Sequence, residues 1–339
     1  MDKPDHAPPL LRSEPGARVV VTGGAGFVGS HLVAELLRRG YSVRVVDDLS
    51  TGSLANLAAC ESHPQLSVRI ESVAAAGAAG EACTDADMVF HLAGVVGVRL
   101  LADAPLAVIR RNLDCTTALL AAASARGVPV LFTSSSEVYG DGPVPFRECD
   151  PVRPGVTEGR RGGYACAKAM SEWLAFGHGA QEGLPAVVAR LFNTVGPRQS
   201  GEHGMVLPRF VHQALAGKPI TVYGDGEQTR CFAHVREVAR ALVDLATTPD
   251  CVGRVFNVGS AVETTVGELA ELVRRLAGSR SPIQRMPFAD VFPHGFIDPP
   301  RRLPCLDRLR QAIGWVPDAP VDSIVAELVE LARTSELIV

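Results

Sequence analysis

The sequence predicts an α/β fold, a doubly wound parallel sheet with helices on both faces. Three observations predict it. Short β-branched segments alternate with segments of helical periodicity through the first two thirds of the chain. Glycines fall where the first predicted strand turns into the first predicted helix. The 339 residues, 47% of them hydrophobic, suffice for one large domain or for two closely joined ones.

The first predicted unit is a strand, a glycine turn and a helix. Residues 19–22 favour a strand, and residues 31–37 repeat apolar side chains at helical spacing. Between them lie Gly23, Gly26 and Gly29. Glycine lets such a turn close and lets the backbone approach a pyrophosphate, and the free N–H groups of the helix favour phosphate.

An acidic residue follows the second predicted strand. Residues 42–46 form this strand, and Asp47 comes directly after it. A carboxylate at this place accepts hydrogen bonds from the adenosine ribose hydroxyls and repels a 2′-phosphate. The turn and Asp47 together predict binding of NAD rather than NADP. A structural glycine turn without a cofactor is the alternative interpretation.

The later segments continue the alternation of strands and helices. Strands are predicted at 66–70, 88–92, 128–133, 186–191, 220–223 and 255–258, and helices at 54–59, 105–126, 164–179, 208–216 and 235–247. Ligands bind at the carboxyl ends of parallel strands, so functional side chains should follow the first, second, fourth and fifth strands of the sheet. Two glycine-rich stretches, 74–80 and 140–163, are predicted to be irregular.

The pattern divides the chain into two main parts. Residues 17–192 are predicted to be mainly nucleotide-binding, and residues 193–339 mainly substrate-binding, with the segment 235–260 returning to the first part. Residues 1–16 are charged and proline-rich and are expected to be a disordered tail.

Charge and cysteine usage exclude several classes of protein. The net charge is −4, and lysine and arginine are scattered, so we expect no nucleic-acid partner. The 8 cysteines form no CxxC pair and lie near no histidine at metal-ligand spacing, which favours free thiols in the cytoplasm over disulfides or a metal site. No apolar run is long enough to span a membrane.

A tyrosine and a lysine carry the predicted chemistry. Tyr164 and Lys168 lie four positions apart, on one face of a predicted helix. A nearby cation favours the phenolate, so the lysine is expected to lower the pKa of the tyrosine and make it a base. The pair follows a strand that ends in the hydroxyl-bearing residues 133–136, and a serine there can bond the same substrate oxygen. This spacing is common by chance, so the pair alone is weak evidence.

The motifs TGGAGFVGSH, VVDD, HLAG, SSSEVYG, YxxxK and RLFNTVGPRQ occur in this order. Together they resemble the extended short-chain dehydrogenase/reductases that act on nucleotide sugars, the NAD-dependent epimerases and dehydratases, from Arg18 to the C-terminus. The resemblance implies a Rossmann-type fold, NAD as cofactor and a nucleotide-diphosphate sugar as substrate. It also implies a homodimer, formed through the long helix 105–126 and the tyrosine helix.

The resemblance assigns roles to individual residues. It makes Tyr164 the base and Ser135 its partner, with Lys168 on the nicotinamide ribose. Residues implied at the cofactor are Gly23, Gly26, Phe27, Val28, Asp47, Leu92, Ala93, Gly94, Asn112, Tyr164 and Lys168. His91 is implied there too, where the backbone of this segment contributes more than the imidazole. Residues implied at the substrate are Ser136, Asn193, Tyr223, Arg230 and Arg302, of which Asn193 and Arg230 contact the diphosphate.

The residues after the serine favour one reaction. The stretch SSEVYG resembles the matching segment of UDP-glucuronic acid decarboxylases, and DPPRRLP, which contains Arg302, resembles their C-terminal arginine segment. In those enzymes a 4-keto sugar loses its C6 carboxylate, so Glu137 would organise reprotonation and Arg302 would hold the carboxylate or the enolate. The expected reaction converts UDP-glucuronic acid to UDP-xylose, UDP-4-keto-xylose or both.

Other interpretations stay open at this point. In one alternative, Glu137 only orients a loop. In another, the protein is a 4-epimerase of UDP-hexoses or UDP-uronates, in which Arg302 binds phosphate equally well. The absence of aspartate before Glu137 disfavours a 4,6-dehydratase. A non-enzymatic NAD-binding scaffold would lose the serine, tyrosine and lysine, which are all present here.

Overall fold

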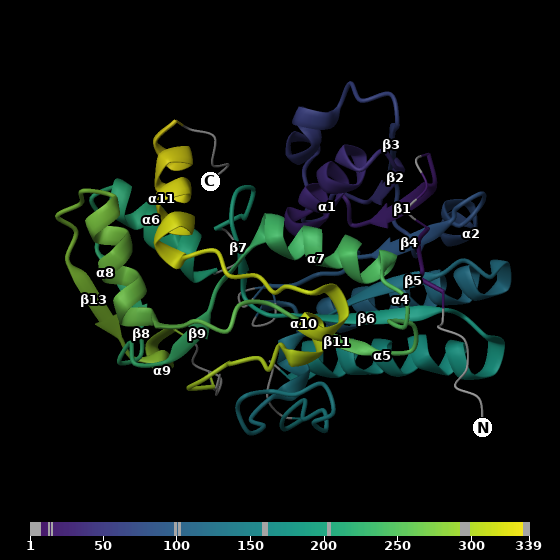
Figure 1. The fold of residues 1–339 in the computed structure, drawn as a ribbon. Helices are drawn as coiled ribbons and strands as arrows, with labels where there is room; N and C mark the ends of the chain where they lie inside the picture. Colours follow the sequence, from purple (N-terminus) through teal and green to yellow (C-terminus); the bar gives the residue numbers. More distant parts are fainter. Residues whose placement is uncertain are drawn as a thin grey trace.

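The computed structural model describes residues 8–12, 14, 16–97, 100, 103–157, 162–201, 205–291 and 299–334. Its centre is a seven-stranded parallel sheet of order β11-β6-β5-β4-β1-β2-β3, which confirms the predicted fold class (Figure 1). The strands are β1 (Arg18–Thr22), β2 (Ser42–Asp47), β3 (Leu66–Ile70), β4 (Met88–His91), β5 (Val130–Ser135), β6 (Ala186–Leu191) and β11 (Val255–Val258). The chain reverses its direction of winding between β1 and β4, where such sheets open a crevice for ligands.

Helices cover both faces of the sheet because the strand side chains alternate. Val19 and Val21 of β1 pack into one core with helices α1 (Phe27–Arg38) and α7 (Val235–Thr247). Val20 faces the other core, which contains α2 (Ala78–Ala82), α4 (Pro105–Arg126) and α5 (Gly162–Glu182). Figure 1 shows α7 on the opposite side of the sheet from α5.

A smaller C-terminal group of elements has its own apolar core. Helices α6 (Val206–Leu215), α8 (Val266–Leu276) and α11 (Val321–Arg333) pack with β8 (Ile220–Tyr223), which pairs with β13 (Ile283–Met286). Figure 1 shows this group at one end of the molecule, beside the sheet. The remaining elements are η1 (Leu54–Cys60), η2 (Ser136–Tyr139), β7 (Thr194–Val195), β9 (Thr229–Cys231), β10 (Ala233–His234), β12 (Glu263–Thr265), α9 (Phe288–Val291) and α10 (Asp307–Ile313).

Some boundaries differ from the sequence-based expectation. Helix α1 begins at Phe27 rather than at residue 31, so the glycine turn leads straight into its first turn. Strand β5 ends at Ser135, two residues later than predicted. The stretch 74–80, predicted to be irregular, ends in the first three residues of α2.

The N-terminal segment also differs from the expected disordered tail. Leu10 and Leu11 are buried, and the Leu11 N–H donates to Ala246 O at 2.9 Å. These leucines pack into the core that contains α7, while residues 1–7, 13 and 15 lie outside the described residues. Among the described helices, none has the length and apolarity that crossing a membrane requires.

Candidate active site

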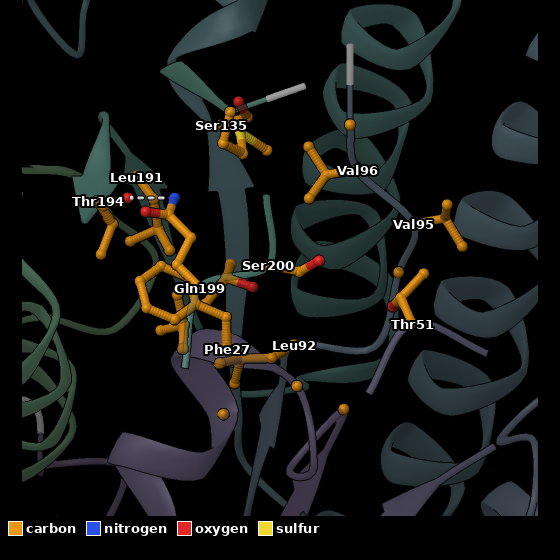
Figure 2. A pocket seen from close by; sticks show the side chains of 18 of the residues that line it. Phe27, Thr51, Leu92, Val95, Val96, Ser135, Leu191, Thr194, Gln199 and Ser200 are labelled. Carbon is orange, nitrogen blue, oxygen red and sulfur yellow. Dashed lines mark hydrogen bonds between the residues drawn. The ribbon is translucent and has the colours of Figure 1, made fainter. Parts of the chain in front are cut away.

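One cavity of about 1230 Å³ lies along the carboxyl ends of the strands and extends to the C-terminal group. Of the residues that the sequence assigns to cofactor, substrate or chemistry, His91 is absent from the lining, which includes Gly23, Gly26, Phe27, Val28, Gly29, Asp47, Leu92, Ala93, Gly94, Asn112, Ser135, Ser136, Glu137, Tyr164, Lys168, Asn193, Tyr223, Arg230 and Arg302. Figure 2 shows a part of the lining, with Phe27 and Leu92 on one side and Ser135 on another.

The glycine turn leaves no room for side chains. A Cβ on Gly29 would lie 2.1 Å from Gly23 O, and a Cβ on Gly23, whose φ is +73°, would lie 2.7 Å from Ala93 N. The N-cap of helix α1 is Gly26, which has no side chain to cap the helix, so the first N–H groups of α1 stay available at the cavity. These features fit a pyrophosphate held by backbone N–H groups.

Asp47 is fixed at the end of β2. Its carboxylate accepts hydrogen bonds from the backbone N–H groups of Ala25 at 2.9 Å and Leu49 at 2.8 Å. Burial raises the pKa of Asp47, and those hydrogen bonds oppose the rise. The carboxylate lines the cavity in a set orientation, as a residue that binds ribose hydroxyls requires.

Asn112 gives a second sign of a close-fitting ligand. Its amide donates to Val95 O at 3.0 Å and Val108 O at 2.8 Å, whereas its buried Oδ1 has no hydrogen-bond partner among the described residues. A Cβ on Gly94 would lie 2.5 Å from that oxygen. This buried hydrogen-bond acceptor beside Gly94, together with the glycine turn and Asp47, fits binding of NAD.

His91 supports the cavity from outside its lining. The imidazole is fully buried, with Nδ1 at 2.7 Å from Thr22 Oγ1 and Nε2 at 3.1 Å from Thr116 Oγ1. Burial lowers the pKa of His91 to about 3, so the ring is neutral. The Ala93 N–H donates to the same Thr22 Oγ1 at 3.3 Å, so the imidazole anchors the segment that faces the cavity.

The predicted serine, tyrosine and lysine come together. Ser135 ends β5, and its Oγ accepts from the Glu137 N–H at 3.3 Å and is hydrogen-bonded to Tyr164. Helix α5 buries Tyr164 and Lys168 on one face, and Lys168 Nζ donates to Thr133 O at 3.0 Å. A phenol, a hydroxyl and an ammonium therefore share one wall of the cavity.

The pKa of Tyr164 shifts against the prediction. Burial raises it above its usual range, the hydrogen bond with Ser135 opposes the rise, and the charge of Glu137 adds to it. Burial also lowers the pKa of Lys168 to about 8. Burial of the phenol outweighs any lowering by Lys168, whose ammonium donates to a backbone carbonyl, so the net direction is opposite to the expected one.

Glu137 and Arg302 form an ion pair inside the cavity. Arg302 Nη1 donates to Glu137 Oε1, and the exposed fractions of the two side chains are 8% and 20%. Glu137 lies in η2, directly after the strand that carries Ser135. The structure thus brings together two residues separated by 165 positions, next to Ser135 and Tyr164.

The far end of the cavity contains residues that the sequence analysis missed. The Arg209 guanidinium lies 3.9 Å from the centre of the Tyr223 ring, and its Nη1 donates to Thr221 O at 2.9 Å. Gln228 donates to Tyr223 O at 2.8 Å. An arginine on an amphipathic helix is normally exposed, so no sequence signal marked Arg209. Within the described part of the chain, no cluster of histidine, cysteine or acidic residues fits a metal ion.

Comparisons with known proteins agree with this geometry. The sequence profile of the NAD dependent epimerase/dehydratase family matches residues 19–259. A UDP-N-acetyl-alpha-D-glucosaminuronate decarboxylase of Bacillus cytotoxicus is 36% identical over 324 residues, which are 94% of this chain and 98% of that protein. UDP-glucuronic acid decarboxylase 1 of Danio rerio is 33% identical over 317 residues, which are 93% of this chain and 73% of that protein.

Solved structures show the same fold. UDP-N-acetylglucosamine 4-epimerase from Methanobrevibacter ruminantium superposes with a TM-score of 0.85 at 30% identity, covering 95% of this chain and 100% of that one. UDP-glucose 4-epimerase from Thermus thermophilus, solved in complex with NAD, gives a TM-score of 0.80 at 30% identity, covering 93% and 99%.

Proposed function

This chain belongs to the NAD-dependent epimerase/dehydratase family, and from that premise we propose that it decarboxylates a UDP-linked uronic acid. The proposed substrate is UDP-glucuronic acid, and the products are CO₂ and UDP-xylose, UDP-4-keto-xylose or both. The relative named for UDP-N-acetylglucosaminuronate makes the 2-acetamido sugar the second substrate to test.

The first step uses the wall of the cavity that carries Tyr164. Tyr164 takes the proton from the sugar 4-hydroxyl as the phenolate, while Ser135 Oγ bonds the same sugar oxygen. This step requires the bound substrate and cofactor to lower the pKa of the phenol, which burial raises. The ammonium of Lys168 lies one helical turn from Tyr164 and would hold the nicotinamide ribose beside it. The glycine turn and Asp47 would hold NAD, which would supply the acceptor for the hydride from C4.

The second step uses the ion pair. The 4-ketone turns the sugar into a β-keto acid whose carboxylate is C6. The C5–C6 bond then breaks, CO₂ leaves, and the electrons of the bond form an enolate with its oxygen on C4. Arg302 holds the carboxylate and then the enolate oxygen, because a guanidinium binds either group through two N–H donors. Glu137 then directs a proton from water to C5. The 4-keto pentose would either take back the hydride at C4, which gives UDP-xylose and restores NAD, or leave as UDP-4-keto-xylose with the cofactor reduced.

The observation that carries the proposal is the ion pair of buried Arg302 and partly buried Glu137 beside Tyr164 and Ser135. An epimerase needs the tyrosine and the serine, since its opening step is the same, but C4 inversion alone gives no task to an acid–guanidinium pair next to them. The solved relatives named 4-epimerases make epimerisation the second candidate function.

Release of CO₂ separates the two functions. We expect the protein with NAD to release one CO₂ per UDP-glucuronic acid or UDP-N-acetylglucosaminuronic acid consumed, measured with substrate labelled at C6. A product that keeps all its carbon and is inverted at C4 would contradict decarboxylation. The Tyr164→Phe variant should release none.

The Glu137→Gln variant tests the second step separately. We expect CO₂ release to fall about a hundredfold or more, because the neutral amide can neither pair with Arg302 nor deliver a proton. UDP binding, followed by calorimetry, should change less than about threefold, since the amide keeps the size of the side chain. Unchanged turnover would remove Glu137 from the mechanism.

We further propose that the protein works as a cytoplasmic homodimer. Its 8 cysteines are free thiols, which suits a reducing compartment. Large apolar side chains are exposed on the two helices expected at the dimer contact: Leu106 on α4, and Met170 and Trp173 on α5.

A further inference from the structure

The two residues of the ion pair come from distant parts of the chain that meet at Phe146. The Phe146 N–H donates to Leu303 O, and the Cys305 N–H donates to Phe146 O, each at 2.8 Å. Residues 303–305 directly follow Arg302, so this contact sets the position of the Arg302 backbone. Phe146 itself is buried and forms an isolated parallel bridge with Pro304.

The backbone of Glu137 is attached to the same phenylalanine. Tyr139, two residues after Glu137, stacks on Phe146 with ring centres 4.8 Å apart and planes at 4°. Both rings are buried, and the Arg190 guanidinium lies 4.7 Å from the centre of the Tyr139 ring. The stack therefore joins the segment that carries Glu137 to the segment that carries Arg302.

A single side chain bonds all three segments. Asn257 on β11 is fully buried; its Oδ1 accepts from the Tyr139 hydroxyl at 2.7 Å, and its Nδ2 donates to Phe146 O at 3.0 Å and to Cys305 O at 3.2 Å. The amide orientation is fixed, because a flipped amide would set its oxygen against two carbonyls. Asn257 does not line the cavity.

We propose that Asn257 is a positioning residue that sets the distance between Glu137 and Arg302 through Tyr139, Phe146 and Cys305. This inference rests on the proposed function, in which the pair acts on the substrate carboxylate and on C5. An asparagine suits the place because one amide supplies an acceptor to the first segment and two donors to the other two. Catalysis is sensitive to shifts of about 1 Å in such groups.

A double-mutant cycle tests whether the network acts through the ion pair. Tyr139→Phe removes the hydroxyl bound to Asn257 and keeps the stacked ring, and should lower kcat about tenfold with KM changed less than about twofold. In the Glu137→Gln background the same change should lower kcat less than about twofold, because the pair is already lost. An equal loss in both backgrounds would overturn the proposal. Tyr41→Phe removes a hydroxyl from another buried tyrosine, directly before β2, and should leave kcat unchanged.

Hydrogen exchange tests the network without any reaction. In Asn257→Asp, the two donors are replaced by an oxygen that faces Phe146 O and Cys305 O, so the amides of Phe146 and Cys305 should exchange about tenfold faster or more. The amide of Ile220, which donates to Pro282 O in the C-terminal group, serves as the control and should keep its rate. Unchanged exchange at Phe146 and Cys305 would overturn the proposal even if the protein releases CO₂. If the protein releases no CO₂ but these amides loosen, the network stands and the proposed function fails.

Discussion

At the scale of single residues, His91 shows how burial fixes a protonation state. Thr116 Oγ1 donates to Asn112 O at 2.8 Å, so it accepts from His91 Nε2–H, and Nδ1 is left to accept from Thr22 Oγ1. Protonation would put a charge on a ring that is fully buried, with the charge of Lys168 acting on it as well. The ring therefore resists protonation, and its pKa falls to about 3.

This shift predicts a loss of stability in acid. The folded pKa of about 3 lies below the usual imidazole pKa of 6.5, so between these values the unfolded chain binds the proton and the folded chain does not. Stability should fall by about 2 kcal/mol from this residue as the pH goes from 7 to 5. Denaturant unfolding of wild type and His91→Gln at both pH values measures it, since the variant lacks the titrating ring. His31, whose pKa burial lowers to about 4, is kept in both proteins. An equal pH dependence in the two would contradict the assignment.

The residues that sequence reasoning found share a local signal. Tyr164 and Lys168 are one helical turn apart, so spacing placed them on one face, and Ser135 and Glu137 lie within one short motif whose roles the family resemblance implied. Asn257 carried no such signal, because its partners lie 48 to 118 positions away. The pKa of Tyr164 could not be predicted from the sequence either, since it depends on how completely the fold buries the phenol.

At the scale of elements, the prediction succeeded where periodicity and end signals agree. Helix α4 has Pro105 in its first turn and ends at Gly127, whose φ is +65°, and its bounds match the prediction. Helix α8 received no predicted bounds although Thr265 and Glu268 form a capping box, because the residues after 258 were expected only to alternate between short helices and irregular segments. The pairing of β8 with β13 joins distant segments, and no local pattern predicts it.

Helices α4 and α5 yield a prediction about assembly. Trp173 is 69% exposed on α5, and burying such a side chain against a second copy would remove a large apolar area from water. We expect Trp173→Asp to convert a dimer to a monomer in analytical ultracentrifugation, because the new charge would be buried without a partner. Val262, 64% exposed and outside both helices, is the matched control, and Val262→Asp should remain dimeric. A Trp173→Asp dimer would place the contact elsewhere.

At the scale of the whole molecule, two apolar cores supply one cavity. The sheet and its helices contribute the glycine turn and Asp47, and the C-terminal group contributes Arg209 and Tyr223. Each core packs on its own side chains, so the two ends of the cavity rest on separate parts of the fold. We therefore infer that the cofactor and the UDP moiety bind to different parts of the fold. A substitution in one part should weaken the binding of one ligand and leave the binding of the other unchanged.

Thermal unfolding with each ligand alone tests this separation. NAD or UDP at about 100 times its Kd should each stabilise the wild type by about 2.7 kcal/mol, a rise in Tm of several degrees. Tyr223→Ala should lose most of the UDP-induced rise, because it removes the ring that packs beneath Arg209, and should keep the NAD-induced rise. Tyr223→Phe keeps that ring and should retain both. If Tyr223→Ala weakened both rises equally, the two ends of the cavity would be energetically coupled, and the C-terminal group would have to be treated as part of the cofactor site.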